Sequence, residues 1–410
     1  MPTIHIAALA LLLFCCLPAT GQKPPKFTIK VPQKTTPPGS TSGASRPAVQ
    51  PGDTPVRAVF VTLLVTSDLE GTIYAGDKAY PLKPDQEAPV PISLYADRME
   101  LRFEGPDSFV EKVKMEFSPA TRGSRSDYHL SVRENYLLYL RKLKEMNRTE
   151  RILDGISRQM VFIAGSLEGR DVRDFEISRY EVTVQQFALF ADQKRNWSGQ
   201  DTTGSIVFTK GGFLYDTYKP GINWRHDPFG NVRPPQDSLH PVIHVSWHEA
   251  NEYCKWLSEN DKRYKYRLPT ADEWEYAAGC GNYFNIYPWG NEVELETLPG
   301  NTADLSLLRG LPQMKAENVS PFDDGFAGTS PAGSFSQNCF SLFDMAGNVA
   351  EWTADDWVVE HVDGSRDAQK IIKGGSYFVL AHECAVMKKQ GFSPAKRHRG
   401  IGFRVVRDPK

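Results

Sequence analysis

The feature that most constrains this chain is a run of short motifs near its C-terminus, where aromatic residues, paired glycines and oxygen-bearing side chains recur without a helical period. The motifs are Gly347–Thr353 (GNVAEWT), Lys373–Tyr377 (KGGSY) and Gly402–Val405 (GFRV). In the first motif, the amide oxygen of Asn348 and the carboxylate of Glu351 lie beside a glycine that lets the backbone bend tightly, and hard oxygen ligands of this kind suit Ca²⁺. The same pattern is typical of a tight turn that places an aromatic side chain in a core, so the residues alone leave both interpretations open.

Motifs of the same character lie upstream. They are Phe175–Thr183 (FEISRYEVT), Arg267–Ala278 (RLPTADEWEYAA) and Pro288–Asn291 (PWGN). Together with the C-terminal motifs they resemble the formylglycine-generating enzyme (sulfatase-modifying factor) domain family, from about Met160 to Arg407. The resemblance implies an α+β fold of the C-type-lectin-like kind with little regular structure, and it is stronger evidence of fold than of chemistry.

The N-terminus predicts export. The apolar stretch Ile4–Leu17 is too short to span a bilayer and is followed by a small-residue cleavage pattern, so residues 1–21 are predicted to be a signal peptide. Cys15 and Cys16 leave lipoprotein processing as an alternative. Residues 22–56 are rich in Pro, Ser and Thr and predict a disordered tether. We expect no transmembrane helix, and a net charge of −2 gives no reason to expect nucleic acid as a partner.

The rest of the chain divides into three regions. Residues 57–122 carry short strand patterns separated by Gly, Pro and Asp turns, which predict a small β-sandwich that loosely resembles a PEGA-like surface module. Residues 128–158 carry an apolar stripe and predict a connecting helix, with a membrane-surface or partner helix as the alternative. The family-like domain is expected over residues 159–410. Within it, Thr270 and Glu273 have the spacing of a capping box and predict a helix start.

Four cysteines remain when the predicted signal peptide is set aside: Cys254, Cys280, Cys339 and Cys384. In an oxidising compartment they allow three pairings, and the sequence does not choose among them. The family resemblance implies that Cys254 has lost its disulfide partner, because Val405 stands at the partner position. We therefore expect Cys254 to act as a small buried hydrophobe.

The resemblance also implies structural Ca²⁺ held by two clusters of side-chain and carbonyl oxygens. The first cluster is Asn301 and Asp324 with the carbonyls of Thr302 and Phe326. The second cluster is Asn348 and Glu351 with the carbonyls of Val349 and Thr353. We expect the second cluster to be the more secure, because the insertion between Thr302 and Asp324 is longer than the family pattern.

A copper site is not expected. In the family, two cysteines bind copper(I) and activate oxygen, because soft thiolates suit that metal. The resemblance places them three residues after Ser376 and five residues further on, which in this chain are Val379 and Cys384. Valine offers no electron pair and one thiolate cannot make a two-sulfur site. The catalytic-site positions are therefore expected to be Cys384, as a vestigial residue, and Ser376.

Two further patterns suggest sites. His244 and His248 have a spacing that metal ligands use, although they span a predicted strand end and helix start, so their rings need not share a face. Lys388–Lys389 and Lys396–Arg399 form a basic cluster where the family places its substrate cleft. The cluster predicts either a solvated face or a docking site for an acidic peptide or glycan.

These observations favour a secreted or cell-envelope protein, in the periplasm or at the outer membrane, that acts as a non-catalytic binding or assembly module for a protein or peptide partner. Its layout resembles that of exported gliding-motility and type-nine-secretion lipoproteins, and a homo-oligomer is compatible with this prediction. The alternative is an oxidoreductase that converts a target protein cysteine to formylglycine with an altered active site. Val379 discriminates between the two.

Overall fold

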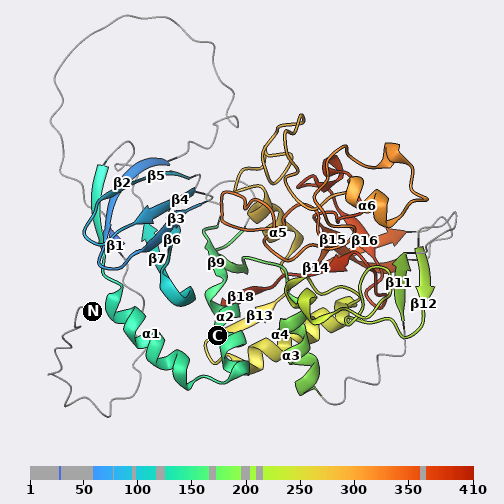
Figure 1. The fold of residues 1–410 in the computed structure, drawn as a ribbon, viewed down its shortest axis with the longest axis horizontal. Coiled ribbons are helices and arrows are strands. Elements are labelled where there is room, and N and C mark those ends of the chain that lie inside the picture. Colours follow the sequence, from blue (N-terminus) through green and yellow to red (C-terminus); the bar gives the residue numbers. More distant parts are fainter. Residues whose placement is uncertain are drawn as a thin grey trace, which may run out of the picture.

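The computed structural model describes most of the chain beyond the predicted tether (Figure 1). The described residues are 27–28, 59–76, 78–94, 98–116, 125–165, 172–194, 204–208, 216–360 and 366–410. The predicted signal peptide, and the predicted tether apart from Phe27–Thr28, lie outside them. None of the helices in the described ranges is long and apolar enough to cross a membrane.

The N-terminal region contains two sheets. One has five strands in the order β1-β7-β6-β3-β4, and the other has three in the order β5-β2-β8. The strands are β1 (Phe27–Thr28), β2 (Val59–Ser67), β3 (Gly71–Ala75), β4 (Lys78–Leu82), β5 (Ala88–Leu94), β6 (Arg98–Glu104), β7 (Val110–Glu116) and β8 (Arg125–Leu130). Leu63 and Val65 of β2 share one buried core with Leu101 and Phe103 of β6, so the sheets pack face to face.

Two helices follow these sheets and connect them to the rest of the molecule along the lower side of Figure 1. They are α1 (Arg133–Glu145) and α2 (Arg148–Arg158). Tyr139 of α1 packs into the N-terminal core. Residues 128–158, predicted as a single helix, therefore contain the end of β8 and two helices. The helices are separate because Asn147 caps α2, accepting a hydrogen bond from the Glu150 backbone N–H at 3.0 Å.

The described part of the family-like region is built on two four-stranded sheets, a hairpin and four α-helices. The sheet orders are β13-β18-β10-β9 and β16-β15-β14-β17, and the hairpin pairs β11 with β12. The strands are β9 (Met160–Ile163), β10 (Phe175–Ser178), β11 (Ser205–Phe208), β12 (Asp216–Lys219), β13 (Tyr264–Arg267), β14 (Ala350–Glu360), β15 (Arg366–Lys373), β16 (Gln390–Phe392), β17 (Ile401–Gly402) and β18 (Val406–Pro409). The helices are α3 (Val184–Gln193), α4 (Trp247–Asn260), α5 (Ala271–Ala278) and α6 (Leu305–Gly310). This mixture confirms the predicted α+β class.

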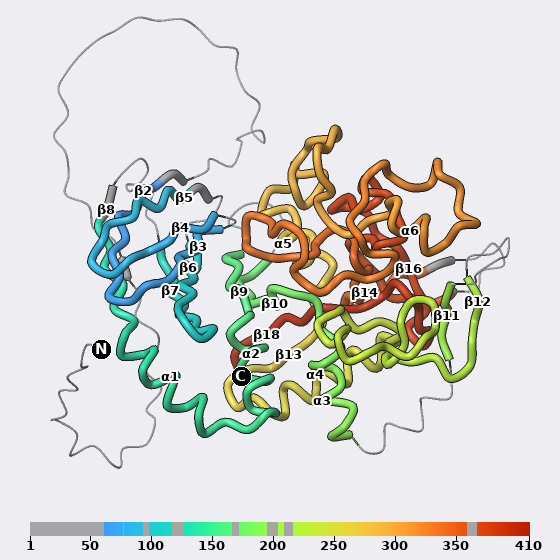
Figure 2. The backbone as a smooth tube through the Cα atoms, in the orientation of Figure 1, coloured from blue at the N-terminus to red at the C-terminus, as the bar shows by residue number. Residues whose placement is uncertain are grey.

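The C-terminal motif joins the ends of this region. Figure 2 shows β18, in red, between β10 and β13. Just before β18, Phe403 enters an aromatic core in which Phe187 of α3 stacks on Tyr253 of α4, with ring centroids 5.7 Å apart. Trp352 is fully buried in the same core. The aromatic residues of the sequence motifs therefore hold the two sheets and two helices together.

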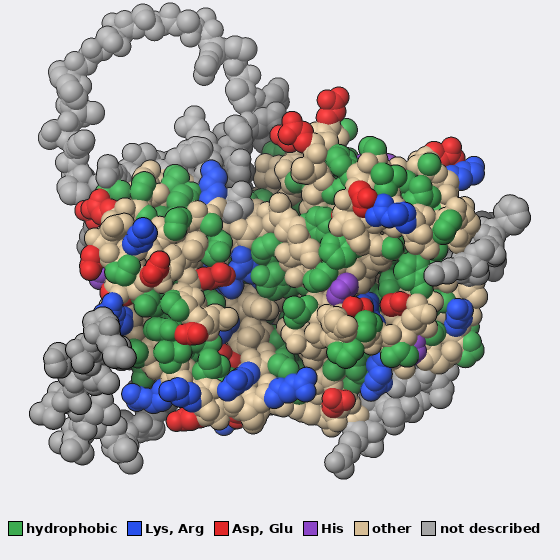
Figure 3. Space-filling view, in the orientation of Figure 1, with side chains coloured by type: hydrophobic (Ala, Val, Ile, Leu, Met, Phe, Trp, Pro, Cys, Tyr) green, Lys and Arg blue, Asp and Glu red, His purple; other side chains and the backbone are tan. Residues whose placement is uncertain are grey.

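Between α5 and β14 the chain is mostly loop, and α6 is the one α-helix within this continuously described stretch. The predicted capping box at the start of α5 is confirmed: Thr270 Oγ1 accepts from the Glu273 backbone N–H at 3.1 Å, and the Glu273 carboxylate accepts from the Thr270 N–H at 2.8 Å. On the face drawn in Figure 3, Lys and Arg along the lower edge have Asp and Glu among them. This face therefore carries no extended field of one charge.

Candidate functional site

The loop after β15 places Val379 and Cys384 next to each other. Gly374 and Gly375 have φ angles of 92° and 73°, which an L side chain rarely adopts. A Cβ atom on Gly375 would lie 2.7 Å from Cys384 Sγ and 3.0 Å from Val379 Cγ2. The two positions that the family resemblance assigns to copper ligands therefore both lie close to Gly375, and Val379 offers only methyl groups to a metal.

Cys384 is fully buried, and its Sγ lies 4.0 Å from the Leu380 carbonyl oxygen. Burial raises the pKa of its thiol to about 12, so the sulfur is protonated at neutral pH. A thiolate, and not a thiol, is the form that binds metals. Ser376 on the same loop is also almost buried, and its Oγ accepts a long hydrogen bond of 3.4 Å from the Phe378 N–H.

The His244–His248 pattern does not form a metal site. His244 is buried, with Nδ1 2.7 Å from Ser205 Oγ and Nε2 2.9 Å from the Asp227 carbonyl oxygen. Both ring nitrogens are therefore occupied. Within the described ranges, no group of three or more His, Cys, Asp or Glu residues could hold a metal ion through those side chains alone.

The prediction of an exposed basic face is wrong for Arg397 and Arg399, because both side chains are buried. Arg397 forms an ion pair with Glu249 of α4. Arg399 lies 2.8 Å from Asp216, and its guanidinium lies 3.9 Å from the centre of the Phe208 ring. These arginines therefore tie the C-terminal loop to α4 and the β11–β12 hairpin, where sequence reasoning had placed a solvated or docking surface.

Glu351, a predicted Ca²⁺ ligand, is fully engaged inside the protein. Its two carboxylate oxygens accept from Arg404 Nε at 2.9 and 2.7 Å, and one of them accepts from Trp274 Nε1 at 2.7 Å. All three side chains are buried. Arg404 is named in the sequence analysis only as part of the motif GFRV, and its partner Glu351 lies 53 positions away in the chain.

The other members of the second cluster point elsewhere. Asn348 Oδ1 accepts from the Ser330 N–H at 2.9 Å and from Asn301 Nδ2 at 3.2 Å. The Thr353 carbonyl accepts from Trp247 Nε1 at 2.8 Å, and the Val349 N–H donates to Glu181. Asn348 and Glu351 have no hydrogen-bond partner in common. The two side chains of the second predicted set are therefore held by different partners, and this Ca²⁺ site stays a prediction.

An acidic residue missed by the sequence analysis lies beside this cluster. Asp344 is buried, and its Oδ1 has no hydrogen-bond partner. Burial, together with the charge of Glu351, raises its pKa to about 6. Burial and the charges of these two carboxylates also raise the pKa of Glu181 well above its usual value. A cation would offset this excess of negative charge. In the sequence, the feature that could have identified Asp344 is its position just before the GNVAEW motif.

The first predicted Ca²⁺ cluster fits a cation better. Asn301 Oδ1, Thr302 Oγ1 and Asp324 Oδ2 are all buried without a hydrogen-bond partner. Asn301 Nδ2 donates to the Gly328 carbonyl at 2.9 Å, which places its side chain at the loop that contains Asp324 and Phe326. Burial, followed by the charge of Asp304, raises the pKa of Asp324 to about 7. Hard oxygen acceptors that lack donors are what Ca²⁺ ligation requires.

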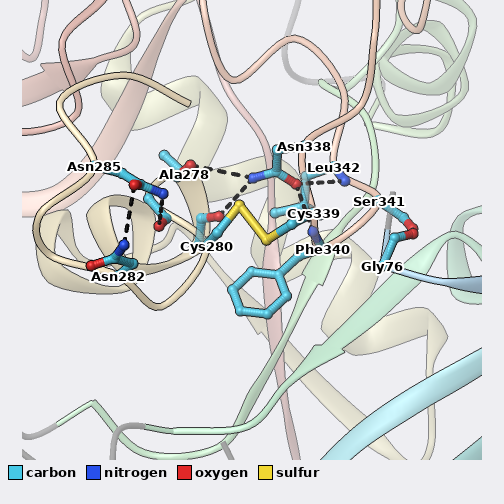
Figure 4. Close-up of a disulfide and its surroundings, with 12 residues drawn as sticks. Gly76, Ala278, Cys280, Asn282, Asn285, Asn338, Cys339, Phe340, Ser341 and Leu342 are labelled. Carbon is cyan, nitrogen blue, oxygen red and sulfur yellow. Dashed lines mark hydrogen bonds between the residues drawn. A yellow bond between two sulfur atoms is a disulfide. The ribbon is translucent and has the colours of Figure 1, made fainter. Parts of the chain in front are cut away.

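One disulfide is present among the described residues, and it resolves the cysteine pairing. Cys280 and Cys339 are bonded, while Cys254 and Cys384 are free and buried. Figure 4 shows Asn338 beside the bond, and its amide donates to the Ala277 carbonyl at 2.8 Å. The disulfide therefore joins the loop after α5 to the loop before the GNVAEW motif. Burial raises the pKa of Cys254 far above its usual value, consistent with the expected hydrophobic role.

Comparison with known proteins accords with this fold. Residues 147–409 match the family described as sulfatase-modifying factor enzyme 1-like domain. The mouse protein named formylglycine-generating enzyme is 32% identical over 267 residues, which cover 58% of this chain and 67% of the relative. The mouse protein named inactive C-alpha-formylglycine-generating enzyme 2 is 30% identical over 257 residues, covering 57% and 75%.

A solved structure, PvdO from Pseudomonas aeruginosa, aligns with a TM-score of 0.41 at 24% identity, covering 58% of this chain and 81% of that one. The family thus includes relatives named as active and as inactive enzymes. On the extent of the family match, this chain belongs to the sulfatase-modifying factor (formylglycine-generating enzyme-like) domain family.

Proposed function

We propose that this chain is an exported, non-catalytic member of its family that serves as a binding or assembly module for a protein or peptide in the cell envelope. The observation that carries the proposal is that Val379 and Cys384 both lie close to Gly375. A two-sulfur copper site needs two thiolates, and this pair supplies one buried thiol with a raised pKa. The KGGSY loop then serves as a scaffold.

Ca²⁺ is the ion we propose for this scaffold. Asn301 and Asp324 would hold it, with carbonyl oxygens from Thr302 and Phe326 completing the shell, because their side-chain oxygens lack donors. Asp344 would contribute to a second ion beside Glu351. The role is structural, since an ion that binds only the folded state stabilises it by mass action.

The test of the non-catalytic assignment is a copper titration with an activity assay. The purified chain is loaded with copper(I) under reducing conditions, and oxygen-dependent aldehyde formation is measured on a Cys-x-Pro-x-Arg peptide. We expect no turnover. Turnover that is lost in Cys384→Ser would establish the alternative, an oxidase that generates formylglycine with an altered site. The 32% identity to the mouse formylglycine-generating enzyme is the reason to test this alternative.

A matched pair of variants tests whether a second sulfur at position 379 restores copper(I) binding. Val379→Cys supplies the second sulfur beside Cys384 and is expected to raise copper(I) affinity, whereas Val379→Ser adds a polar atom without a soft donor and is expected to leave it unchanged. Equal copper affinity in the two variants would mean that the loop does not hold the pair in the geometry described.

A further inference from the structure

A cavity of about 520 Å³ lies between the N-terminal sheets and the family domain, in the region where β6 contacts β9 (Figure 1). Tyr74 of β3 and Met99 of β6 line it on one side, and Phe162 of β9, Trp289 and Phe340 line it on the other. Ligand pockets commonly have volumes of roughly 300–1,000 Å³ and favour domain interfaces. The N-terminal wall precedes residue 147, where the family match begins, so the cavity belongs to the arrangement of this chain and not to the family domain alone.

The two walls of the cavity are held together by contacts between the domains. A Cβ atom on Gly76 would lie 2.3 Å from the Cys339 carbonyl oxygen, so the β3–β4 turn lies directly against the disulfide-bonded loop. Ser341 Oγ also donates a hydrogen bond to the Gly76 carbonyl, as Figure 4 shows. Arg179 pairs with Glu104 of β6 at 2.7 Å. The cavity is therefore pre-formed, which lowers the cost of binding.

The two arginines of the described lining are already paired within the protein. Arg98 Nη1 lies 2.7 Å from an Asp174 carboxylate oxygen, and Arg102 Nε lies 2.7 Å from a Glu104 carboxylate oxygen. Both guanidinium groups therefore have their counter-ions in the folded chain, and neither calls for an acidic ligand.

The other two charged side chains of the described lining offer no free charge to a ligand inside the cavity. Glu100 Oε1 lies 3.7 Å from Lys112 Nζ, and burial raises the pKa of Glu100. Lys78 is exposed, and an ion pair with an exposed ammonium contributes little. A charged ligand would therefore lose hydration without gaining a partner, which an uncharged ligand avoids.

The asparagine amides of the lining are bonded within the protein as well. Asn282 Nδ2 donates to Asn285 Oδ1 at 3.1 Å, and Asn285 Nδ2 donates to the Gly279 carbonyl at 3.0 Å. Asn338 Nδ2 donates to the Ala277 carbonyl at 2.8 Å. These amides hold the loops of the wall, and the surface left to a ligand is more apolar than polar. An apolar group that displaces poorly bound water from such a surface gains affinity.

Aromatic rings from separate segments supply much of this apolar surface. Trp289 stacks on Tyr287 with ring centroids 4.5 Å apart and planes 2° apart, and of these two rings only that of Trp289 lines the cavity. Tyr287 covers one face of the indole, so the cavity meets the other face or the edge. Tyr276 and Phe340 also line the cavity, with ring centroids 6.4 Å apart. Aromatic ligands bind such rings through stacked or edge-to-face contacts.

We propose that this cavity binds a small, uncharged aromatic molecule that packs on Trp289 and lies against Phe162 and Phe340. The volume, the internal pairing of the charged lining and the aromatic walls all favour this ligand class. The inference goes beyond the proposed function, because it gives the chain a small-molecule site at the junction of its domains. It does not depend on whether the family domain is catalytic.

Two probes that share one skeleton test the charge of the ligand. N-phenyl-1-naphthylamine is uncharged, and 8-anilinonaphthalene-1-sulfonate carries the same rings with an added sulfonate. Both fluoresce more strongly outside water, so each is titrated into the full chain with its disulfide intact. We expect saturable binding of the amine, and we expect the sulfonate to bind at least about tenfold more weakly because its charge finds no partner.

Matched variants locate the binding site. Trp289→Ala removes one aromatic wall and is expected to weaken binding of the amine by about tenfold or more. Phe284→Ala is the matched control, because Phe284 lies in the same loop, is 78% exposed and lies outside the lining, and it is expected to bind like the wild type. Phe162→Asp places a charge in the β9 part of the lining and repeats the measurement if Trp289→Ala fails to fold.

The opposite results are equally clear. Absence of saturable binding of the amine would overturn the inference, and so would equal affinity in Trp289→Ala, Phe162→Asp and the wild type. A sulfonate that binds as tightly as the amine, and loses as much affinity in the two lining variants, would overturn the uncharged ligand class. The copper assay judges the non-catalytic assignment separately.

Discussion

Replacing Asp324 by asparagine should reduce both the pH dependence of the stability of the metal-free protein and its stabilisation by Ca²⁺. The substitution keeps the acceptor for the Phe326 N–H, which donates to Asp324 Oδ1 at 2.8 Å, and deletes the charge on the oxygen that lacks a donor. In the metal-free protein the pKa of Asp324 rises from 3.8 to about 7, because it is buried and lies near Asp304. The folded state therefore holds this proton more tightly than the unfolded chain.

The sign and size of the effect follow from that difference. A raised folded-state pKa contributes stability that is fully present below pH 4 and is lost as the pH rises through about 7. At 1.36 kcal/mol for each pH unit the full difference is about 4 kcal/mol, and the partial exposure of Asp324 reduces it to roughly 2 kcal/mol. Ca²⁺ at a hundred times its Kd raises the free energy of unfolding by about 2.7 kcal/mol. For a domain of this size that is a Tm shift of about 5–10 °C.

The assay is thermal unfolding at pH 5 and pH 8, in chelator and in saturating Ca²⁺. The wild type should lose stability between pH 5 and pH 8 in chelator and recover it with Ca²⁺, whereas both changes should be smaller in Asp324→Asn, by roughly 2 kcal/mol for the pH-dependent part. Asp323→Asn is the matched control, because Asp323 pairs with Arg309 at the surface at 2.7 Å, and it should respond like the wild type. A Ca²⁺ shift as large in Asp324→Asn as in the wild type, or a chelated wild type and a chelated Asp324→Asn that depend equally on pH, would refute the reasoning.

Three further outcomes are expected. Reducing the Cys280–Cys339 bond, whose cysteines are 59 positions apart, should lower the free energy of unfolding by about 4 kcal/mol on the chain-entropy estimate; urea unfolding with and without reductant measures it, and equal midpoints would contradict it. Arg404→Met leaves the buried Glu351 carboxylate unpaired and should cost about 3–5 kcal/mol, while the double variant Arg404→Met/Glu351→Gln should recover part of that loss in the same assay. N-terminal sequencing of native material should find a mature chain that begins near Gln22, and an intact leader in a soluble cytoplasmic pool would contradict export.

The family and its α+β fold were readable from the sequence because local motifs encode them. The capping box at Thr270 and Glu273 starts α5, as predicted, and Trp274 in this helix is fully buried. The break between α1 and α2 had a readable signal as well, the spacing of Asn147 and Glu150, which the apolar stripe of the surrounding residues obscured.

The site was less predictable because its charges find partners far along the chain. Arg397 reaches Glu249 across 148 positions, and Arg404 reaches Glu351 across 53. A run of basic residues or a motif glutamate carries no local sign that it will be neutralised inside the fold. The same reasoning explains why Cys280 was not assigned to Cys339, since four cysteines with no distinguishing neighbours permit any pairing.

Among the described residues, two free cysteines can report local opening of the folded protein. Cys254 lies on α4 in the aromatic core and Cys384 lies in the loop over Gly375, and both thiols are inaccessible in the closed state. An alkylating reagent reaches each thiol only when its surroundings open, so the two labelling rates measure the free energies of two separate opening events. The opening rates of the loop around Gly375 and of α4 can therefore be compared in the native protein without an introduced label.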